Sequence, residues 1–418
     1  MRWNKYLPFA FLYFFINVAG LPLGLTYTAL LTPFLYAWIL LVRKKEVLLP
    51  FLCLLLPFLL VHLFIVEAEM MKYAIAVLNI LSVYVFAQAV YTWLSVSDQP
   101  ERVLKPLLIM NTILCLVAVI CFYTPLQSLF WIRQDLTDKV DQFLRLKMFT
   151  YEASYYALLF TPVFAYYLLQ YMLQRNTIRG GWLLFMIFLP MVLSFSIGVI
   201  LCLLAAGLLT FLVHAGTLAP KRRILNGFIT IGFLSAILLA VVFVFFPDNP
   251  LFIRLGNIFT GKDTSAMGRT GDAFLLARQL LAENNSWWGI GPGQLTAAGA
   301  DMIRGYYLYH YTEAVAIPNA AAETLVLFGW LGFTLRLGLQ VFLFFFTRVW
   351  KNYYRLLLFF FVFLFQFMGS YITNLAEYVI WVFAFSNAFS LFDVRSGYAA
   401  VSPADGGPAL PSLPAHTG

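Results

Sequence analysis

Apolar runs of about twenty residues recur along this 418-residue chain, and they limit what it can fold into. A helix of about 18 or more apolar residues can cross a bilayer core of roughly 30 Å, whereas a soluble core needs no such runs. The composition agrees, with 62% hydrophobic residues, 11% charged residues and a mean hydropathy of +0.84. The predicted fold is therefore all-α, a polytopic bundle of transmembrane helices.

About twelve spans are predicted. Residues 1–246 carry nine of them and 320–393 carry three, with a long polar segment, 247–319, in between. Residues 394–418 are rich in Pro, Gly, Ala and Ser, which predicts a disordered tail. The seventh and eighth spans can alternatively form one broken hairpin. The predicted spans are 6–20, 23–42, 47–66, 73–95, 106–123, 152–174, 181–195, 197–214, 224–246, 320–347, 356–370 and 375–392.

Basic residues are concentrated in alternate connections between the spans, which indicates the orientation of the bundle. With the N-terminus inside, both termini are cytoplasmic, and the segments 124–151 and 247–319 lie outside. The second segment is too long for the charge rule to apply. The inner connections then hold sixteen of the 27 basic residues: Arg2, Lys5, Arg43, Lys44, Lys45, Arg102, Lys105, Arg175, Arg179, Lys221, Arg222, Arg223, Arg348, Lys351, Arg355 and Arg395.

The net charge of +8 does not indicate a nucleic-acid partner, because the basic residues form short clusters between apolar spans. No disulfide framework is expected either, since all four cysteines fall inside apolar runs. The N-terminal stretch lacks a small-residue cleavage site, so an uncleaved first span is expected rather than a signal peptide.

The stretch 268–295, GRTGDAFLLARQLLAENNSWWGIGPGQL, is polar and glycine-rich within this apolar chain. Phe274, Ala277 and Leu281 share one helical face, while Asp272, Gln279 and Glu283 share another. This spacing predicts an amphipathic helix that lies on the membrane or on the bundle. The outer segment 247–319 is therefore expected to form a small folded helical cap.

Three glycines, Gly289, Gly291 and Gly293, follow this helix. Spaced glycines cradle phosphate when they join a strand to a helix N-terminus, but these follow a helix and a Trp-Trp pair. The first interpretation is a turn that ends the helix, because glycine adopts the required backbone angles. The second is direct contact with a substrate.

In the sequence RLKMFTYEASYYALL, Arg145 precedes Glu152 at the predicted outer mouth of a span. An unpaired carboxylate near the hydrocarbon edge is unfavourable. Glu152 is therefore either part of an interfacial salt bridge or an acid or base at the mouth of an outward-facing cavity.

Arg269 lies on the other outer loop, and a guanidinium matches phosphate oxygens at any working pH. A lone loop arginine is more often solvated surface. Arg145 and Arg269 together could clamp a pyrophosphate, provided that they meet in the fold. Arg278, further along the same stretch, is another candidate for substrate contact.

His310 and Glu313 precede the tenth span, which opens at Asn319. One histidine and one carboxylate are too few for a dedicated metal site, so no metal and no cofactor are expected. Asn319 is a good N-cap, and Glu323 in the first turns suits the helix dipole. Capping alone would explain both residues.

The order of these elements resembles the O-antigen ligase and polymerase superfamily. Between Gly268 and Phe333, a G-R element, a helix, a W-G-x-G-x-G turn and an Asn-led helix with ETLVLFGWLGF follow one another. The upstream RLKMFTYEASYYA is similar to the R-x-x-G-x-F-x-E-P-S element of exopolysaccharide polymerases, although Ala153 replaces the usual proline. The resemblance extends over residues 140–335 in its motifs and over the whole chain in topology.

The resemblance implies a metal-independent, inverting glycosyltransferase of the GT-C kind on the periplasmic face of the bacterial inner membrane. The donor would be a glycan on undecaprenyl pyrophosphate, and the pyrophosphate-binding role falls by motif to Arg269 and Arg145. Membrane lipid and the proteins that regulate chain length or flip the donor are the implied partners.

The chain departs from this family at Pro318, which stands where ligases have the histidine assigned as the base. Either His310 substitutes, or the base is Glu152 or Glu313, or no base is needed. The departure favours a polymerase of repeat units over a ligase that transfers glycan to lipid A core. A flippase or transporter is the alternative from another class. It would place several charges inside its spans, whereas here Arg336 is the main such residue.

Overall fold

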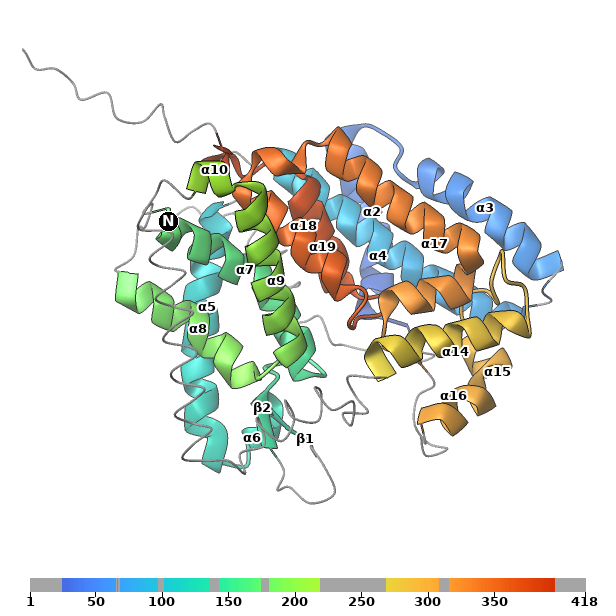
Figure 1. Ribbon diagram of the computed structural model, residues 1–418, viewed down its shortest axis with the longest axis horizontal. Helices are drawn as coiled ribbons and strands as arrows, with labels where there is room; N and C mark the ends of the chain where they lie inside the picture. Colours follow the sequence, from blue (N-terminus) through green and yellow to red (C-terminus); the bar gives the residue numbers. More distant parts are fainter. Residues whose placement is uncertain are drawn as a thin grey trace, which may run out of the picture.

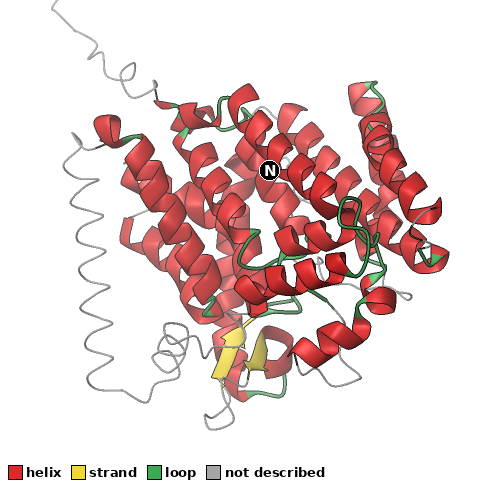
Figure 2. Ribbon diagram, turned by 45° about the vertical axis from the view of Figure 1, so that its right-hand side comes forward, coloured by secondary structure: helices red, strands yellow, loops and turns green. Residues whose placement is uncertain are grey.

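The structure, a computed structural model, describes six stretches of the chain. They are residues 25–96 except 65 and 67, 101–134, 143–173, 180–218, 268–307 and 316–394. The predicted spans 6–20 and 224–246, the tail from residue 395 onward, and both His310 and Glu313 lie outside the described residues. Helices make up most of the described part, as Figure 2 shows.

Ten of the predicted spans each coincide with one helix, and the fold is that of a helical membrane protein. Among the described residues, three helical runs are long and apolar enough to cross a membrane by length and composition: Met70–Val96, Val103–Tyr123 and Ala320–Phe346. The count of twelve spans stays a prediction. The ten helices are α2 (Tyr27–Arg43), α3 (Leu48–Phe64), α4 (Met70–Val96), α5 (Glu101–Ile120), α7 (Ala153–Met172), α8 (Gly180–Ser194), α9 (Ile197–Val213), α17 (Ala320–Phe346), α18 (Tyr353–Phe365) and α19 (Leu375–Phe385).

Apolar side chains cover the outward face of α9. Leu201, Leu204, Leu208 and Leu212 are all exposed, and they recur every three or four residues. Residues at this spacing share one side of a helix. A continuous exposed apolar face of this kind is suited to lipid rather than to water.

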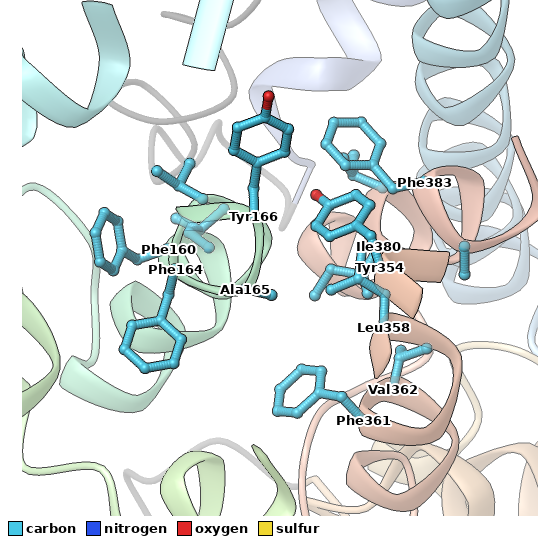
Figure 3. Close-up of a cluster of buried hydrophobic side chains, with 14 of the residues drawn as sticks. Phe160, Phe164, Ala165, Tyr166, Tyr354, Leu358, Phe361, Val362, Ile380 and Phe383 are labelled. Atoms are coloured by element: carbon cyan, nitrogen blue, oxygen red, sulfur yellow. The ribbon is translucent and has the colours of Figure 1, made fainter. Parts of the chain in front are cut away.

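The largest hydrophobic core lies where α7 meets α18 and α19. In Figure 3, Ala165 of α7 points toward α18, whereas Phe160 and Phe164 point away from it on the other side of α7. The Tyr166 ring of α7 contacts the Tyr354 ring of α18, with the ring centroids 5.9 Å apart. The Tyr354 hydroxyl donates to the Pro162 carbonyl at 3.1 Å, so its polar atom is hydrogen-bonded within the core. The side chains labelled there are Phe160, Phe164, Ala165, Tyr166, Tyr354, Leu358, Phe361, Val362, Ile380 and Phe383.

A short hairpin departs from the predicted all-α fold. Strand β1 (Trp131–Gln134) follows the one-turn helix α6 (Gln127–Phe130) and pairs antiparallel with β2 (Phe143–Leu146). The buried Trp131 donates from Nε1 to the Ala118 carbonyl at 2.8 Å, which fastens the hairpin to the end of α5. Strands of four residues contain too few alternations for their period to be recognised in a sequence.

Helix α14 (Gly271–Ala282) confirms the predicted amphipathic pattern. Ala277 and Leu281 are buried, and Gln279 and Glu283 are exposed, whereas Phe274 and Asp272 are both half-buried. The helix packs against α17 and therefore lies on the bundle. With α15 and α16 it occupies the same end of the bundle as the hairpin (Figures 1 and 2).

The remaining short elements are α10 (Ala215–Leu218), α15 (Leu295–Ala298), α16 (Ala300–Tyr307), and the 3-10 turns η2 (Cys121–Tyr123), η3 (Val349–Lys351) and η4 (Ser390–Phe392).

The glycine turn docks where α17 is broken at Gly329, which has φ 65° and ψ −169°. Gly291 N donates to the Leu327 carbonyl at 3.0 Å. A Cβ on Gly289, which has φ 80°, would lie 2.6 Å from the nitrogen of Gly329, and one on Gly293 would lie 2.3 Å from a backbone oxygen of α4. The turn approaches its neighbours so closely that only glycine fits.

Helix α18 begins at Tyr353, three residues before its predicted start at residue 356. The Asn352 side chain accepts from Arg355 N at 3.0 Å and caps the helix. Arg355 thus lies in the first turn, buried, with Nε donating to the Ala384 carbonyl at 2.9 Å. It fastens α18 to α19 and also donates from Nη2 to the Thr347 carbonyl at 2.8 Å, in the connection between α17 and α18.

Candidate functional site

A cavity of about 340 Å³ lies between α7, α9, the hairpin, the start of α14 and the loop that joins α18 to α19. The elements around it can be located in Figure 1. Its wall combines segments that are far apart in the sequence. The main polar side chains that line it are Arg145, Glu152, Ser196, Arg269, Ser370 and Asn374.

Arg145 reaches the cavity from strand β2. Its side chain is 4% exposed, and Nε donates to the Ser194 carbonyl at 3.0 Å, at the end of α8. Strand β2 packs against both α7 and α8, so the hairpin fixes where this guanidinium lies. A buried cation held in this way contributes a fixed positive charge to the wall.

Glu152 and Arg269 form an ion pair inside the cavity. Arg269 Nη2 lies 3.3 Å from Glu152 Oε1, and the side chains are 33% and 28% exposed respectively. The Ser154 hydroxyl also donates to Glu152 Oε1. The predicted salt bridge of Glu152 therefore exists, with Arg269 of the segment 247–319 as its partner, and the pair stays accessible from the cavity.

The charges around Glu152 keep it ionised. Burial raises the pKa of its carboxyl, but the Arg269 guanidinium, hydrogen bonds from Ser154 and Arg269, and the charge of Arg145 together hold that pKa below its usual range. Glu152 is thus a carboxylate at neutral pH. It can accept a proton or a hydrogen bond, but it cannot act as a general acid there.

Asn319 holds Arg269 in place. Its side-chain oxygen accepts from Ala322 N at 2.9 Å, which confirms the predicted N-cap of α17. Its Nδ2 donates to the Arg269 carbonyl at 2.7 Å and to the Phe367 carbonyl at 2.8 Å. One buried amide therefore ties the start of α17 to two walls of the cavity, while Pro318 beside it lines the cavity itself.

Left-handed backbone conformations occur around the cavity at residues other than glycine. Phe195 has φ 49° and stands between the end of α8 and the lining residue Ser196, and Ser370 in the lining has φ 74°. Such conformations cost on the order of 1–3 kcal/mol and cluster at functional sites. Their position favours this cavity as the functional site.

The remaining wall of the cavity is apolar. Leu158 from α7, Val199 and Leu201 from α9, and Phe365 from α18 all line it. Leu201 also begins the exposed leucine stripe of α9 and is 43% exposed. The lining thus combines charged and apolar side chains, and it includes one leucine of the exposed apolar stripe of α9.

The other sequence candidates lie elsewhere. Gly289, Gly291 and Gly293 are absent from the cavity lining, and their close packing favours the turn interpretation over substrate contact. Arg278 is exposed on α14 and does not line the cavity. Within the described ranges, no three histidine, cysteine, aspartate or glutamate side chains come together as a possible metal site.

The sequence analysis did not identify several of the residues that line the cavity. Asn374 could have been recognised as a cap before the last apolar run, and it does cap α19. Ser196 and Ser370 offered nothing to distinguish them, because isolated serines near span ends are common. A charge inside a predicted span was also missed. Glu377 is buried in α19 and pairs with Arg336 of α17.

Comparison with known proteins found no matching family model and no matching curated protein. The family resemblance therefore rests on the order of the motifs between residues 140 and 335.

Proposed function

We propose that this chain is a glycosyltransferase that polymerises undecaprenyl-pyrophosphate-linked repeat units into O-antigen or exopolysaccharide on the periplasmic face of the bacterial inner membrane. The proposal rests mainly on one observation: Arg145, Glu152 and Arg269 line a single cavity. These three residues come from the two motif segments that carry the family resemblance. In this proposal both chain termini are cytoplasmic.

The charge of the cavity supports an anionic ligand. Its wall holds two guanidinium groups, Arg145 and Arg269, against the single carboxylate of Glu152 among the described lining residues. Guanidinium groups match phosphate oxygens in pairs of hydrogen bonds. A diphosphate can bind here by exchanging part of the Arg269–Glu152 contact for contacts of its own.

The apolar wall supports a lipid attached to that anion. A polyprenyl chain bonded to the diphosphate would extend past Leu158 and Val199 toward Leu201 and the exposed face of α9. Apolar surfaces associate because burial removes them from water, and a lipid tail can remain in the bilayer throughout. The combination of guanidinium groups with apolar side chains in one cavity therefore favours a lipid-linked diphosphate over a soluble nucleotide.

In the proposed reaction, an acceptor sugar hydroxyl attacks the anomeric carbon of the donor sugar from the face opposite the diphosphate. A new C–O bond forms, the bond to the diphosphate oxygen breaks, and undecaprenyl pyrophosphate leaves with the bonding electrons. Arg145 and Arg269 stabilise the charge that develops on the leaving group, because preorganised cations act most strongly in a site shielded from water.

Glu152 is the proposed acceptor of the hydroxyl proton. In the absence of ligand, Arg269 lowers the pKa of its carboxyl. A bound diphosphate offsets the charge of Arg269, so the pKa of Glu152 rises and the carboxylate becomes a better base when the donor is present. His310 and Glu313 stay alternative candidates for this role.

Two alternatives differ in what they require of the chain. A ligase of the familiar type would use a histidine where Pro318 lines the cavity, so the polymerase is favoured. A flippase needs charged residues along a conduit. Arg336 and Glu377 pair with each other inside the bundle, and neither lines the cavity, which does not support a conduit.

The test is reconstitution of the purified protein in proteoliposomes with the host's lipid-linked repeat unit, followed by separation of the glycan products by length. The wild-type protein is expected to make long chains, and the Arg269→Ala variant to leave single repeats. The Arg278→Ala variant is the matched control and is expected to keep its activity. Chains that lengthen equally with Arg269→Ala would contradict the proposal, and accumulation of free lipid-linked polymer in cells carrying this variant would instead indicate a ligase.

A further inference from the structure

A second, uncharged group of polar side chains lines the cavity beside the two arginines. Asn374 at the start of α19 is 7% exposed, and Ser196 at the start of α9 is 2% exposed. The Asn374 side-chain oxygen accepts from Ala376 N at 3.0 Å and caps the helix. Among the described residues, the Asn374 Nδ2 and the Ser196 hydroxyl have no hydrogen-bond partner.

A side-chain donor or acceptor that has no partner in the protein must be satisfied by water or by a ligand. Both Asn374 and Ser196 are more than nine-tenths buried, and the cavity is the space that both line. An amide N–H₂ donates, and a hydroxyl both donates and accepts. A ligand that satisfies them must offer acceptor oxygen atoms, and the hydroxyl groups of a sugar supply these without adding charge.

Ser370 adds to the same wall. Its hydroxyl oxygen is buried without a hydrogen-bond partner in the described part of the chain, and its backbone has φ 74°. A serine hydroxyl can turn about its Cα–Cβ bond. Ser370 lines the same cavity, so its hydroxyl is a further candidate for contact with a ligand there.

The loop that carries Ser370 and Asn374 is held rigidly. Ile372 N donates to Glu323 Oε2 at 2.6 Å, and Ala320 N donates to the Gly369 carbonyl at 3.2 Å. Both contacts come from the first turns of α17, the helix whose Asn319 also holds Arg269. The uncharged wall and the guanidinium of Arg269 are thus positioned by one helix end, and a ligand can span them without reorganising the site.

We infer that Asn374 and Ser196, with Ser370, form a subsite for the hydroxyl groups of the donor sugar that is bonded to the diphosphate. This inference rests on the proposed function, because it places a sugar next to a diphosphate held by Arg145 and Arg269. In such a donor the sugar is bonded directly to the diphosphate, and the guanidinium groups and these uncharged side chains line the same cavity.

The test compares two probes on the purified full-length protein in lipid nanodiscs: undecaprenyl pyrophosphate alone, and undecaprenyl pyrophosphate that carries the host's repeat unit. The variants are Asn374→Ser, which keeps a capping side chain but shortens the donor, and Ser196→Ala. Ser196 makes no side-chain cap bond to α9, so alanine removes only its hydroxyl.

Each variant is expected to weaken binding of the sugar-bearing lipid by about three- to tenfold, as the loss of one hydrogen bond does, and to leave binding of the bare lipid unchanged. Equal weakening of both probes, or of neither, would overturn the subsite. A wild-type protein that binds neither probe would overturn the proposed function itself. A third outcome separates the two proposals. If Arg269→Ala weakens binding of both probes while Asn374→Ser and Ser196→Ala change neither, the diphosphate site is supported and only the sugar subsite is contradicted.

Discussion

The Arg269 guanidinium pairs with Glu152 and also lines the cavity, where a ligand can reach it. The proposed site depends on this combination. An arginine with no partner would cost desolvation energy, whereas one fully occupied by buried carboxylates could not bind a substrate. A single ion pair that is about one third exposed lies between these limits. Arg145 differs, because it is almost fully buried and donates to the Ser194 carbonyl.

The pH dependence of stability tests the charge of Glu152. Its folded pKa lies below its ordinary value of 4.5, so the ion pair stabilises the protein above that value and loses its effect as the pH falls through the folded pKa. We expect Glu152→Gln to lower the melting temperature by an amount that is constant from pH 8 to about pH 5. Because the pair is partly exposed, the effect corresponds to at most about 1 kcal/mol.

The measurement is thermal unfolding of both proteins in detergent between pH 4 and pH 8. The wild-type and Glu152→Gln curves should converge only below about pH 4.5. If they converge already near pH 7, the carboxyl has a raised pKa, and the description of Glu152 as a fixed carboxylate would be wrong.

At the scale of elements, the broken helix α17 organises the site. Its N-cap, Asn319, holds Arg269, its first turns hold the loop of Ser370 and Asn374, and its break at Gly329 receives the glycine turn. The buried pair of Arg336 with Glu377 adds a link from α17 to α19, while Arg336 Nε donates to Gln366 at 3.0 Å. These contacts explain why polar residues lie inside an apolar bundle without forming a conduit.

The glycine turn gives a prediction about packing. We expect Gly289→Ala to destabilise the protein by about 2–5 kcal/mol, because a Cβ there would lie 2.5 Å from the Val326 carbonyl oxygen and the residue has φ 80°. Gly338→Ala in α17 is the control, since nothing lies within 4 Å of its added Cβ, and it should leave stability equal or slightly higher. Thermal unfolding in detergent measures both. A Gly289→Ala variant as stable as the control would show that the turn is not packed as described.

The sequence predicted the elements whose signal is local. Apolar length located ten described helices, the spacing of Ala277 and Leu281 predicted the buried face of α14, and Asn319 was recognisable as a cap. Arg145, Glu152 and Arg269 were chosen by residue type and motif, and the fold brings them to one cavity while their role stays a proposal.

The features that were not predicted depend on tertiary contacts. The β1–β2 hairpin has strands of four residues and is fixed by packing on α5, α7 and α8. The docking of the glycine turn on Gly329 joins segments about forty residues apart, and no local pattern encodes it. The pairing of Glu377 with Arg336 also depends on tertiary contacts. The sequence shows that a carboxylate lies in an apolar run, but it does not show which residue pairs with that carboxylate.

For the whole molecule, the proposal requires the end that carries α14 and the hairpin to face the periplasm. A cysteine at position 278, in a protein whose exposed Cys53 has been changed to serine, should react with a membrane-impermeant maleimide in intact spheroplasts. A cysteine at the exposed position 351 should react only after permeabilisation. Labelling is read by gel shift, and the reverse pattern would place the cavity on the cytoplasmic side and rule out the proposed reaction.

The most direct measurement is the affinity of the purified protein in nanodiscs for undecaprenyl pyrophosphate, compared between the wild type, Arg269→Ala and Arg278→Ala. Loss of a charge-assisted pair of hydrogen bonds should weaken binding about tenfold or more in Arg269→Ala. Arg278→Ala removes the same charge from an exposed position outside the cavity and should bind as the wild type does. Equal affinities for all three proteins, or equal weakening in both variants, would contradict the assignment of this cavity as a site for a lipid-linked diphosphate.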